Sequence, residues 1–471
     1  MVIMNEEPHV SEGKLFGWAN TLFSHSIIVV PRTIDAVRST IKAAIHDGRK
    51  IIGRGAGHSY GDQALNRGEI VIDMSRMDHI LEWDKVSGLL RVEAGANYDQ
   101  ILTCCLLDGW APAVIPGTRY VTMGGALANN VHGKNSYVQR NFGEWVKEFK
   151  ILLASGECYT CSKNINRDLF FAAIGGSGLL GVVIEMTIQL IRIPSAYLSV
   201  KKTTASSLSE LLDQLDRASK KDGFVIAQVD CFPEGSKLGR GTMHTGNFIS
   251  DNLCKDNLEM MRDISPRIFG IFPKQWVSLI GKYILNDFTM KWISRLKYHL
   301  DKNMNSEILY REDIFHFTFL FDLIPSWRYV FRHGFLEYEP LIPKEKARAV
   351  IPQLIALTHE YGMPAYLSAI KIHRADDFLL SYAMDGYSFA LDIPRRPKEK
   401  VKQDELFRRM NEIVLDAYGI IYLAKDANLT SNEFRRMYPN LAQFLTVKEK
   451  YDPEALFQSD MYRRLFQGDT K

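Results

Sequence analysis

Residues Gly53 to Asp62 read GRGAGHSYGD and directly follow the apolar pair Ile51-Ile52. Four of these ten residues are glycine. Glycine lets the backbone approach a ligand closely and turn its N–H groups toward an anion. A short strand that runs into such a loop is therefore a candidate phosphate-binding segment. His58 and Tyr60 are unusual within it, because binding phosphate alone requires neither an imidazole nor a phenol.

Two further glycine-rich zones occur, PGTRYVTMGG at 116–125 and GGSGLLG at 175–181. The first loop lacks the last glycine of the dinucleotide fingerprint, and no acidic residue follows in the expected setting. No glycine loop carries the Lys-Ser or Lys-Thr pair of a P-loop either. Three loops joined by short strands favour one extended cofactor, such as FAD, lying across all of them. The alternative is that they are only tight turns.

Length and composition limit the other classes of protein. The 471 residues suit two or three domains, and the net charge of +3 is too balanced to indicate nucleic-acid binding. The N-terminus does not resemble a signal peptide, and no apolar run reaches about 18 residues. We therefore expect a cytoplasmic protein, with peripheral contact to the inner membrane as an open alternative. Cys158 and Cys161 have CxxC spacing but lie in an alternating, strand-like run without a second such pair, so we expect thiols and no metal site.

Hydrophobic periodicity predicts a mixture of helices and strands. The pattern predicts a helix over 35–48 and strands over 50–52, 69–74, 89–94 and 182–191. From about 196, glycine becomes sparser and aromatic residues denser. Four further segments predict strands of one antiparallel sheet, namely 315–321, 334–341, 366–373 and 387–393. Helices are expected over 344–361, 405–418 and much of 432–466.

The segment 269–299 mixes Trp, Phe, Tyr and Ile with lysine and arginine. One interpretation is a membrane-interface segment, which combines aromatic and basic residues at helical spacing. The other is a pair of core-packing helices with solvated lysines.

The three zones, read as GRGAGHSYGD, PGTRYVTMGGALANNVHGKN and GGSGLLGVV, together resemble the FAD-binding domain of the vanillyl-alcohol-oxidase, PCMH-type, family. Within it they are similar to the flavin subunits of lipid-linked sugar epimerases, and IYLAKD at 421–426 and SDMYRRL at 459–465 extend the resemblance. It implies an α/β FAD-binding domain in two parts, 1–195 and 415–471. Between them, 196–414 would form a substrate domain with an antiparallel sheet flanked by helices, so the resemblance implies an α+β fold.

The resemblance implies an FAD-dependent oxidoreductase that acts on CH–OH groups. One interpretation is oxidation of a secondary hydroxyl to a ketone on a polyprenyl-phosphate-linked pentose, the first half of a 2'-epimerisation, with an NAD(P)H-dependent keto-reductase as partner. A second is a soluble sugar, alditol or aldonolactone oxidase that uses dioxygen. A third is a catalytically silent flavin-binding partner subunit.

The resemblance also implies site residues. Tyr60, His132 and Lys425 are the catalytic candidates. The substrate candidates are Lys134, Glu337, Glu339, Lys371, Ser388 and Lys425. The FAD-binding candidates are Gly53, Arg54, Gly55, Ala56, Gly57, His58, Ser59, Tyr60, Gly61, Asp62, Gln63, Gly117, Thr118, Thr122, Met123, Gly124, Gly125, Asn129, His132, Gly133, Gly178, Ile184 and Tyr422.

Three departures from the epimerase flavoproteins bear on substrate and cofactor. Glu337 and Glu339 stand where that family carries glutamines, and alternate strand residues share a face. Ala390 and Ser388 replace a family cysteine and asparagine. His58 replaces an arginine and resembles the histidine that related oxidases link covalently to the flavin 8α-methyl group. The alternative is a histidine that only hydrogen-bonds a phosphate or the ring edge.

Overall fold

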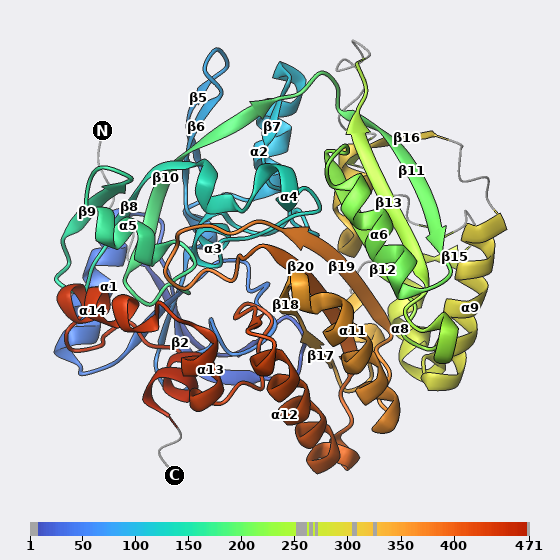
Figure 1. Cartoon of the computed structure of the whole chain (residues 1–471). Helices are drawn as coiled ribbons and strands as arrows, with labels where there is room; N and C mark the ends of the chain where they lie inside the picture. Colours follow the sequence, from blue (N-terminus) through green and yellow to red (C-terminus); the bar gives the residue numbers. More distant parts are fainter. Residues whose placement is uncertain are drawn as a thin grey trace.

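The computed structural model describes residues 8–250, 261–262, 267–268, 272–303, 309–323 and 327–468. The described residues form an α+β fold with three main sheets (Figure 1). The strands are β1 (His9–Phe16), β2 (Phe23–Val30), β3 (Ile51–Arg54), β4 (Ile70–Asp73), β5 (Ile80–Asp84), β6 (Leu89–Glu93), β7 (Trp110–Pro112), β8 (Val146–Leu152), β9 (Cys158–Ser162), β10 (Val182–Arg192), β11 (Tyr197–Ala205), β12 (Phe224–Val229), β13 (Gly241–Phe248), β14 (Arg267–Ile268), β15 (Phe272–Pro273), β16 (Tyr310–Asp313), β17 (Phe335–Tyr338), β18 (Pro340–Pro343), β19 (Leu367–His373), β20 (Gly386–Pro394) and β21 (Ile420–Ile421).

The helices are α1 (Ile34–His46), α2 (Tyr98–Cys105), α3 (Met123–Ala128), α4 (Ser136–Gln139), α5 (Arg167–Ala173), α6 (Leu208–Ala218), α8 (Lys274–Ile284), α9 (Asp287–Asn303), α10 (Ile314–Thr318), α11 (Lys344–Glu360), α12 (Lys400–Asp416), α13 (Ser431–Met437), α14 (Leu441–Tyr451) and α15 (Asp460–Tyr462).

The first sheet, in the order β1-β2-β4-β3, presents the first glycine loop. Helix α1 begins at its N-cap Thr33, whose side chain accepts a hydrogen bond from the Ala36 N–H. Its apolar stripe, including Val37 and Ile41, is buried in one core cluster with Ile51 of β3. The short strand β3 is parallel to β4 and ends at Arg54, so the loop leaves the sheet at the carboxyl end of a buried strand.

The second sheet has the order β5-β6-β10-β8-β9, with β7 also paired to β10. Before α3, Thr122 accepts a hydrogen bond from the Gly125 N–H, so the second glycine zone is a loop closed by a helix cap. Cys158 and Cys161 lie on β9 as free thiols, one exposed and one buried.

The third sheet is antiparallel, and every second side chain along its strands faces the same side of the sheet. Its order is β16-β11-β13-β12-β19-β20-β18-β21, with β17 paired to β20. Helices α6 and α11 contact each other and pack against β12, β13, β18 and β20 (Figure 1). Along β19, Ile370 and Ile372 belong to the core, whereas Ala369 and Lys371 line a cavity. This sheet therefore separates a helix-covered core from the cavity.

The strand predicted over 315–321 is wrong. These residues form α10 followed by a 3-10 turn at Leu320–Asp322. Asp313 caps the helix by accepting from the N–H groups of Phe315 and His316. Phe315, Phe317 and Phe319 are all buried. Phenylalanine alternates with His316, Thr318 and Leu320 in this run, and that period of two resembled a strand.

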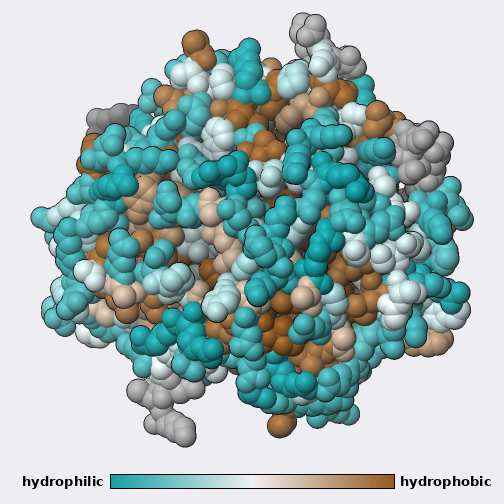
Figure 2. Space-filling view, viewed as in Figure 1, coloured by the Kyte–Doolittle hydropathy of each residue, from teal (hydrophilic) through white to brown (hydrophobic). Residues whose placement is uncertain are grey.

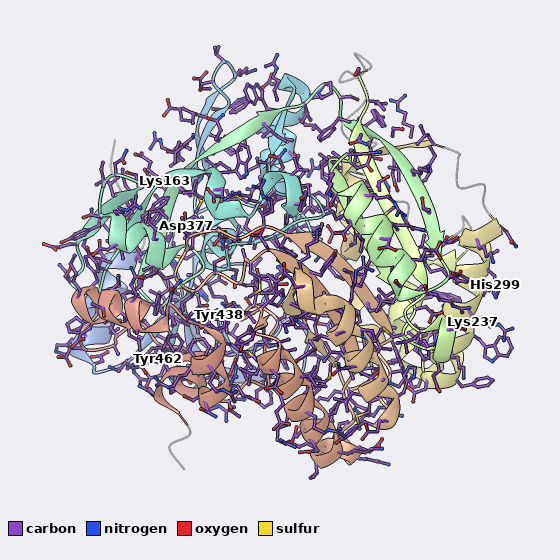
Figure 3. The ribbon with its side chains drawn as sticks, viewed as in Figure 1. Lys163, Lys237, His299, Asp377, Tyr438 and Tyr462 are labelled. Carbon is purple, nitrogen blue, oxygen red and sulfur yellow. The ribbon has the colours of Figure 1, made fainter. Side chains whose placement is uncertain are left out.

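The chain passes from the second sheet to the third between β10 and β11, close to the predicted limit at 195. The predicted tail segment begins at 415, although β21 still pairs with β18 of the third sheet. Beyond it the chain returns to the N-terminal part, where Phe457 bridges Ile51 and α14 packs on α5 (Figure 1). The Tyr438 hydroxyl donates to the Ile421 carbonyl at 2.7 Å and lies inside the fold (Figure 3).

The face of the molecule in Figure 2 is largely hydrophilic, with small apolar areas between polar side chains. Among the described residues, no helix combines the length and apolar character needed to span a bilayer.

Candidate active site

A cavity of about 530 Å³ brings the glycine zones and the third sheet together. Most of the predicted cofactor-binding residues line it: Gly53, Arg54, Gly55, Ala56, Gly57, His58, Ser59, Tyr60, Gln63, Gly117, Thr118, Thr122, Gly124, Gly125, Asn129, His132, Gly133, Gly178 and Tyr422. So do the substrate candidates Lys134, Glu337, Glu339, Lys371 and Lys425. Residues from distant parts of the chain therefore surround one space.

The structure does not bring Met123, Ile184 and Ser388 to the cavity lining. Met123 and Ile184 are buried in two hydrophobic cores. Val183, the neighbour of Ile184, lines the cavity instead. Ser388 is fully buried, and its Oγ lies 2.9 Å from Nε2 of His373.

Gly61 and Asp62 also lie outside the lining and hold the first loop in place. A Cβ at Gly61 would stand 1.8 Å from the Asp426 carbonyl oxygen, so only glycine fits against this backbone. Arg464 donates from Nε and Nη2 to the Asp62 carboxylate at 2.9 and 2.7 Å. The same guanidinium lies 2.9 Å from the Asp426 carboxylate. Asp62 therefore ties the loop to the tail of the chain.

The first glycine zone lies close to the second and is hydrogen-bonded to the third. A Cβ at Gly55 would lie 2.0 Å from Thr122 Oγ1 of the second zone. The Ser59 hydroxyl donates to Gln63 Oε1, and Gln63 Nε2 donates to Ser177 Oγ of the third zone, each at 2.6 Å. Gly57 has φ +70°, which favours glycine. The backbone of all three zones can thus approach one bound molecule.

His58 presents a neutral imidazole to the cavity. Its ring stacks on Trp18 with centroids 4.4 Å apart, and the Arg328 guanidinium lies 4.9 Å from the Trp18 ring. Burial, with the positive charges of Arg328 and Lys425, lowers the pKa of His58 to about 4. Within the described part of the chain, its buried Nδ1 has no hydrogen-bond partner.

Other buried polar atoms of the described residues also lack a hydrogen-bond partner. Asn129 Oδ1 and His132 Nδ1 have none among the described residues, although both side chains line the cavity. Buried polar groups in native structures are normally hydrogen-bonded. These orphaned atoms, together with the close glycine backbone, fit an extended ligand with a phosphate part and a polar ring, as FAD has.

A first ion pair at the cavity joins Lys425 to Glu337, with Nζ 2.8 Å from Oε2. The Lys425 ammonium also lies 3.4 Å from the centre of the Tyr60 ring. Burial raises the pKa of Tyr60 well above its usual value, and the nearby Glu337 adds to the effect. Tyr60 is therefore a neutral phenol beside a buried ion pair.

A second cluster joins Lys371, His132 and Glu339. The Lys371 Nζ lies 3.1 Å from His132 Nε2 and 3.5 Å from Glu339 Oε1. Burial and then the charge of Lys371 lower the pKa of His132. Burial opposes ionisation of Glu339, but Lys371 and His132 outweigh it and hold the pKa of Glu339 well below its usual value. The cluster thus contains an ammonium, a carboxylate and a neutral imidazole.

Asp392 is a cavity residue that the sequence interpretation missed. It lies opposite Glu337 in the register of β17 and β20 and is 6% exposed. No cation of the described residues forms an ion pair with it. Burial and the charge of Glu337 raise the pKa of Asp392 well above its usual value. Strand alternation from the singled-out Ala390 in YSFALDI places Asp392 on the same face, and that signal could have found it.

Lys134 lies farther along the cavity wall and donates to the Phe317 carbonyl oxygen. Burial lowers the pKa of Lys134 to about 7. Ala390, at the position of the family cysteine, also lines the cavity.

The fold and this site define a flavin-dependent oxidoreductase. Residues 25–162 match the family described as FAD binding domain, and residues 188–465 match that of D-arabinono-1,4-lactone oxidase. The chain is 30% identical to decaprenylphosphoryl-beta-D-ribose oxidase of Mycolicibacterium smegmatis, over 96% of this chain and 97% of the relative. It is 25% identical to L-gulonolactone oxidase of Mus musculus, over 95% and 97%. It is 23% identical to L-gulono-1,4-lactone dehydrogenase of Mycobacterium tuberculosis, over 93% and 96%.

The chain therefore belongs to the PCMH-type family of FAD-dependent oxidases that includes the decaprenylphosphoryl-ribose and aldonolactone oxidases. Its cofactor is FAD, and it is an oxidoreductase that acts on CH–OH groups of donors.

Proposed function

We propose that the protein oxidises a secondary hydroxyl of a polyprenyl-phosphate-linked pentose to a ketone, as the first half of a 2'-epimerisation. The observation that carries this proposal is the extent of the cavity. Beyond the two ion-pair clusters its lining includes Met290, Ile293 and Lys297 of α9. A free sugar or lactone needs no such extension, whereas a prenyl chain matches the apolar side chains of Met290 and Ile293.

FAD, when bound, supplies the oxidation by accepting the hydride from the carbinol carbon. The protein must then take the hydroxyl proton. The Glu337 carboxylate, fixed by Lys425 and adjacent to Tyr60, is the acceptor that we assign, because general-base catalysis needs a group within hydrogen-bond reach of the proton. Lys371, His132 and Glu339 present donors and acceptors to the other hydroxyls. Asp392, which retains its proton, adds a further donor.

A ketone product requires a separate reduction to complete an epimerisation. The proposal therefore includes an NAD(P)H-dependent keto-reductase as partner. It also places the enzyme in the cytoplasm at the surface of the inner membrane, where a prenyl-linked substrate is held.

We also infer that His58 would be linked covalently to the flavin 8α-methyl group; a methyl proton and the imidazole proton would be lost, and the two electrons would pass into the flavin ring, which dioxygen reoxidises. A neutral imidazole is nucleophilic, and the buried Nδ1 lacks a partner among the described residues. Acid precipitation of the holoprotein tests this. The yellow colour should stay in the pellet for the native protein and move to the supernatant for His58→Ala. Colour that is released entirely from the native protein would contradict the link.

Anaerobic mixing with candidate substrates tests the oxidation. Polyprenyl-phosphate-linked ribose should bleach the visible absorbance of the flavin, whereas free pentoses should not. A second candidate function, a soluble aldonolactone oxidase, is supported by His58 and by the match to D-arabinono-1,4-lactone oxidase. Rapid turnover of free L-gulono-1,4-lactone with peroxide release would favour it. Failure of every candidate to reduce the flavin would indicate the third possibility, a silent flavin-binding subunit.

A further inference from the structure

Helix α9 carries an exposed apolar stripe. Phe288, Trp292, Leu296 and Leu300 recur every fourth residue and are 70%, 56%, 61% and 57% exposed. Residues four apart lie on one side of a helix. These large side chains therefore point together into solvent, although burying each would stabilise the fold by about 1.5–3 kcal/mol.

The preceding helix α8 carries a second exposed apolar stripe. Trp276, Ile280, Tyr283 and Ile284 have helical spacing and are all substantially exposed. We call the eight side chains on α8 and α9 the apolar hairpin surface. It lies on α8 and α9 at the right of Figure 1, and the front face in Figure 2 carries only small apolar areas. An apolar stripe that is exposed along one side of a helix marks a contact with a protein or a membrane.

Basic side chains run beside the apolar stripe of α9. Lys291, Arg295 and His299 are exposed and recur every fourth residue, and Figure 3 places His299 at the outer edge of α9. Arg295 lies 5.5 Å from the Trp292 ring, and Lys282 of α8 lies 5.0 Å from the Tyr283 ring. Cations next to interfacial aromatic residues are typical of helices that lie in a bilayer surface.

The acids of these two helices do not neutralise that surface. Asp287 pairs with Arg396, and Asp301 pairs with Lys297 and accepts from Thr242. The sequence of α8 contains no acid. A symmetric dimer through this surface would bring the bands of cations on α9 together. An anionic bilayer complements both the apolar and the basic side chains.

The opposite side of α9 faces the active-site cavity. Met290, Ile293, Ser294 and Lys297 line the cavity, and Tyr298 is buried. Helix α9 therefore has apolar residues on its solvent-exposed side and also on the side that lines the active-site cavity. A molecule with its prenyl chain in the bilayer could reach the cavity past α9 without carrying that chain through water.

We propose that the apolar hairpin surface docks onto an anionic lipid bilayer and that the cavity receives its lipid-linked substrate from that bilayer. The docking stands on the hairpin surface alone, whereas the delivery of substrate rests on the proposed function. The headgroup charge and the apolar side chains act together, so binding requires both.

Vesicle sedimentation with the holoprotein tests the docking. The native protein should sediment with phosphatidylglycerol-containing vesicles, more weakly with pure phosphatidylcholine, and less at high salt. Trp292→Glu combined with Leu296→Glu should weaken binding at least about tenfold, because two charges would enter the interface. The matched control is Val86→Glu combined with Val401→Glu, which changes side chains 90% and 84% exposed elsewhere and should bind like the native protein.

Two readouts separate this proposal from its alternatives. Flavin reduction by detergent-dispersed substrate should be equal in the hairpin variant and the native protein, which shows that the active site is intact. Absence of vesicle binding by the native protein, or equal binding by the hairpin variant, would overturn the docking. A dimer seen by light scattering that the hairpin variant loses, without vesicle binding, would assign the surface to a second copy. Vesicle binding without any flavin reduction by the lipid-linked pentose would refute the proposed function and leave the docking standing.

Discussion

Replacing Lys425 by methionine separates the catalytic and structural parts of the Lys425–Glu337 pair. The pair is buried, with side chains 15% and 5% exposed. Removing the ammonium leaves Glu337 beside Asp392 in the cavity wall. Losing one partner of a buried pair costs about 3–5 kcal/mol of stability. Losing a correctly placed general base slows proton transfer by about 10²–10⁴-fold.

The measurements are the melting temperature and the rate constant for flavin reduction in anaerobic stopped flow. Lys425→Met should lower both. Adding Glu337→Gln removes the uncompensated carboxylate, so the double variant should regain much of the lost stability. It should not regain the rate, because the proton acceptor is then absent. Glu337→Gln alone should also slow reduction.

Two outcomes would refute this reasoning. If Glu337→Gln reduces the flavin within about threefold of the native rate, Glu337 is not the proton acceptor, since a general base contributes far more. If the double variant regains its rate together with its stability, the defect of the single variant was structural.

Two other predictions follow from the packing and the charges of the site. Gly61→Ala should lower the free energy of unfolding by about 3 kcal/mol, because its Cβ would meet the Asp426 carbonyl oxygen. The control is Gly223→Ala, whose Cβ would have its nearest atom at 3.6 Å. It should unfold in urea almost as the native protein does. Equal urea midpoints for the two variants would contradict the close contact. The raised pKa of Asp392 means that the folded protein keeps a proton that the unfolded chain loses above about pH 4, so this group destabilises the fold increasingly as pH rises. The melting temperature of Asp392→Asn minus that of the native protein should therefore grow from pH 4 to pH 7, and a constant difference would show that Asp392 is ionised.

Local signals in the sequence predicted much of the fold and of the cofactor site. The glycines of the first loop and the cap of α1 act through neighbours in the chain, so GRGAGHSYGD and its flanking helix could be interpreted directly. Ile184 could not be placed correctly. A bulge in β10 between Val183 and Glu185 shifts the register against β8, and such a shift changes which residues face the cavity.

Contacts between distant segments account for the other differences. Asp62 looked like a ligand of the cofactor because its partner Arg464 lies 402 residues away. The pKa of Asp392 is raised by its burial and by Glu337, which only the pairing of β17 with β20 places opposite it. Alternation within one strand places a side chain on a face, but the charges that it meets come from another strand.

The guanidinium that joins Asp62 to Asp426 has a consequence for biogenesis. The first glycine loop leaves the ribosome long before the arginine that fixes it, which is made about four hundred codons later. Until Arg464 is made, the loop lacks the ion pair with Asp62 that holds it in place. We therefore expect stable flavin incorporation only after residue 464 has emerged. Nascent chains stalled before this point should fail to retain FAD, even though they contain all three glycine zones.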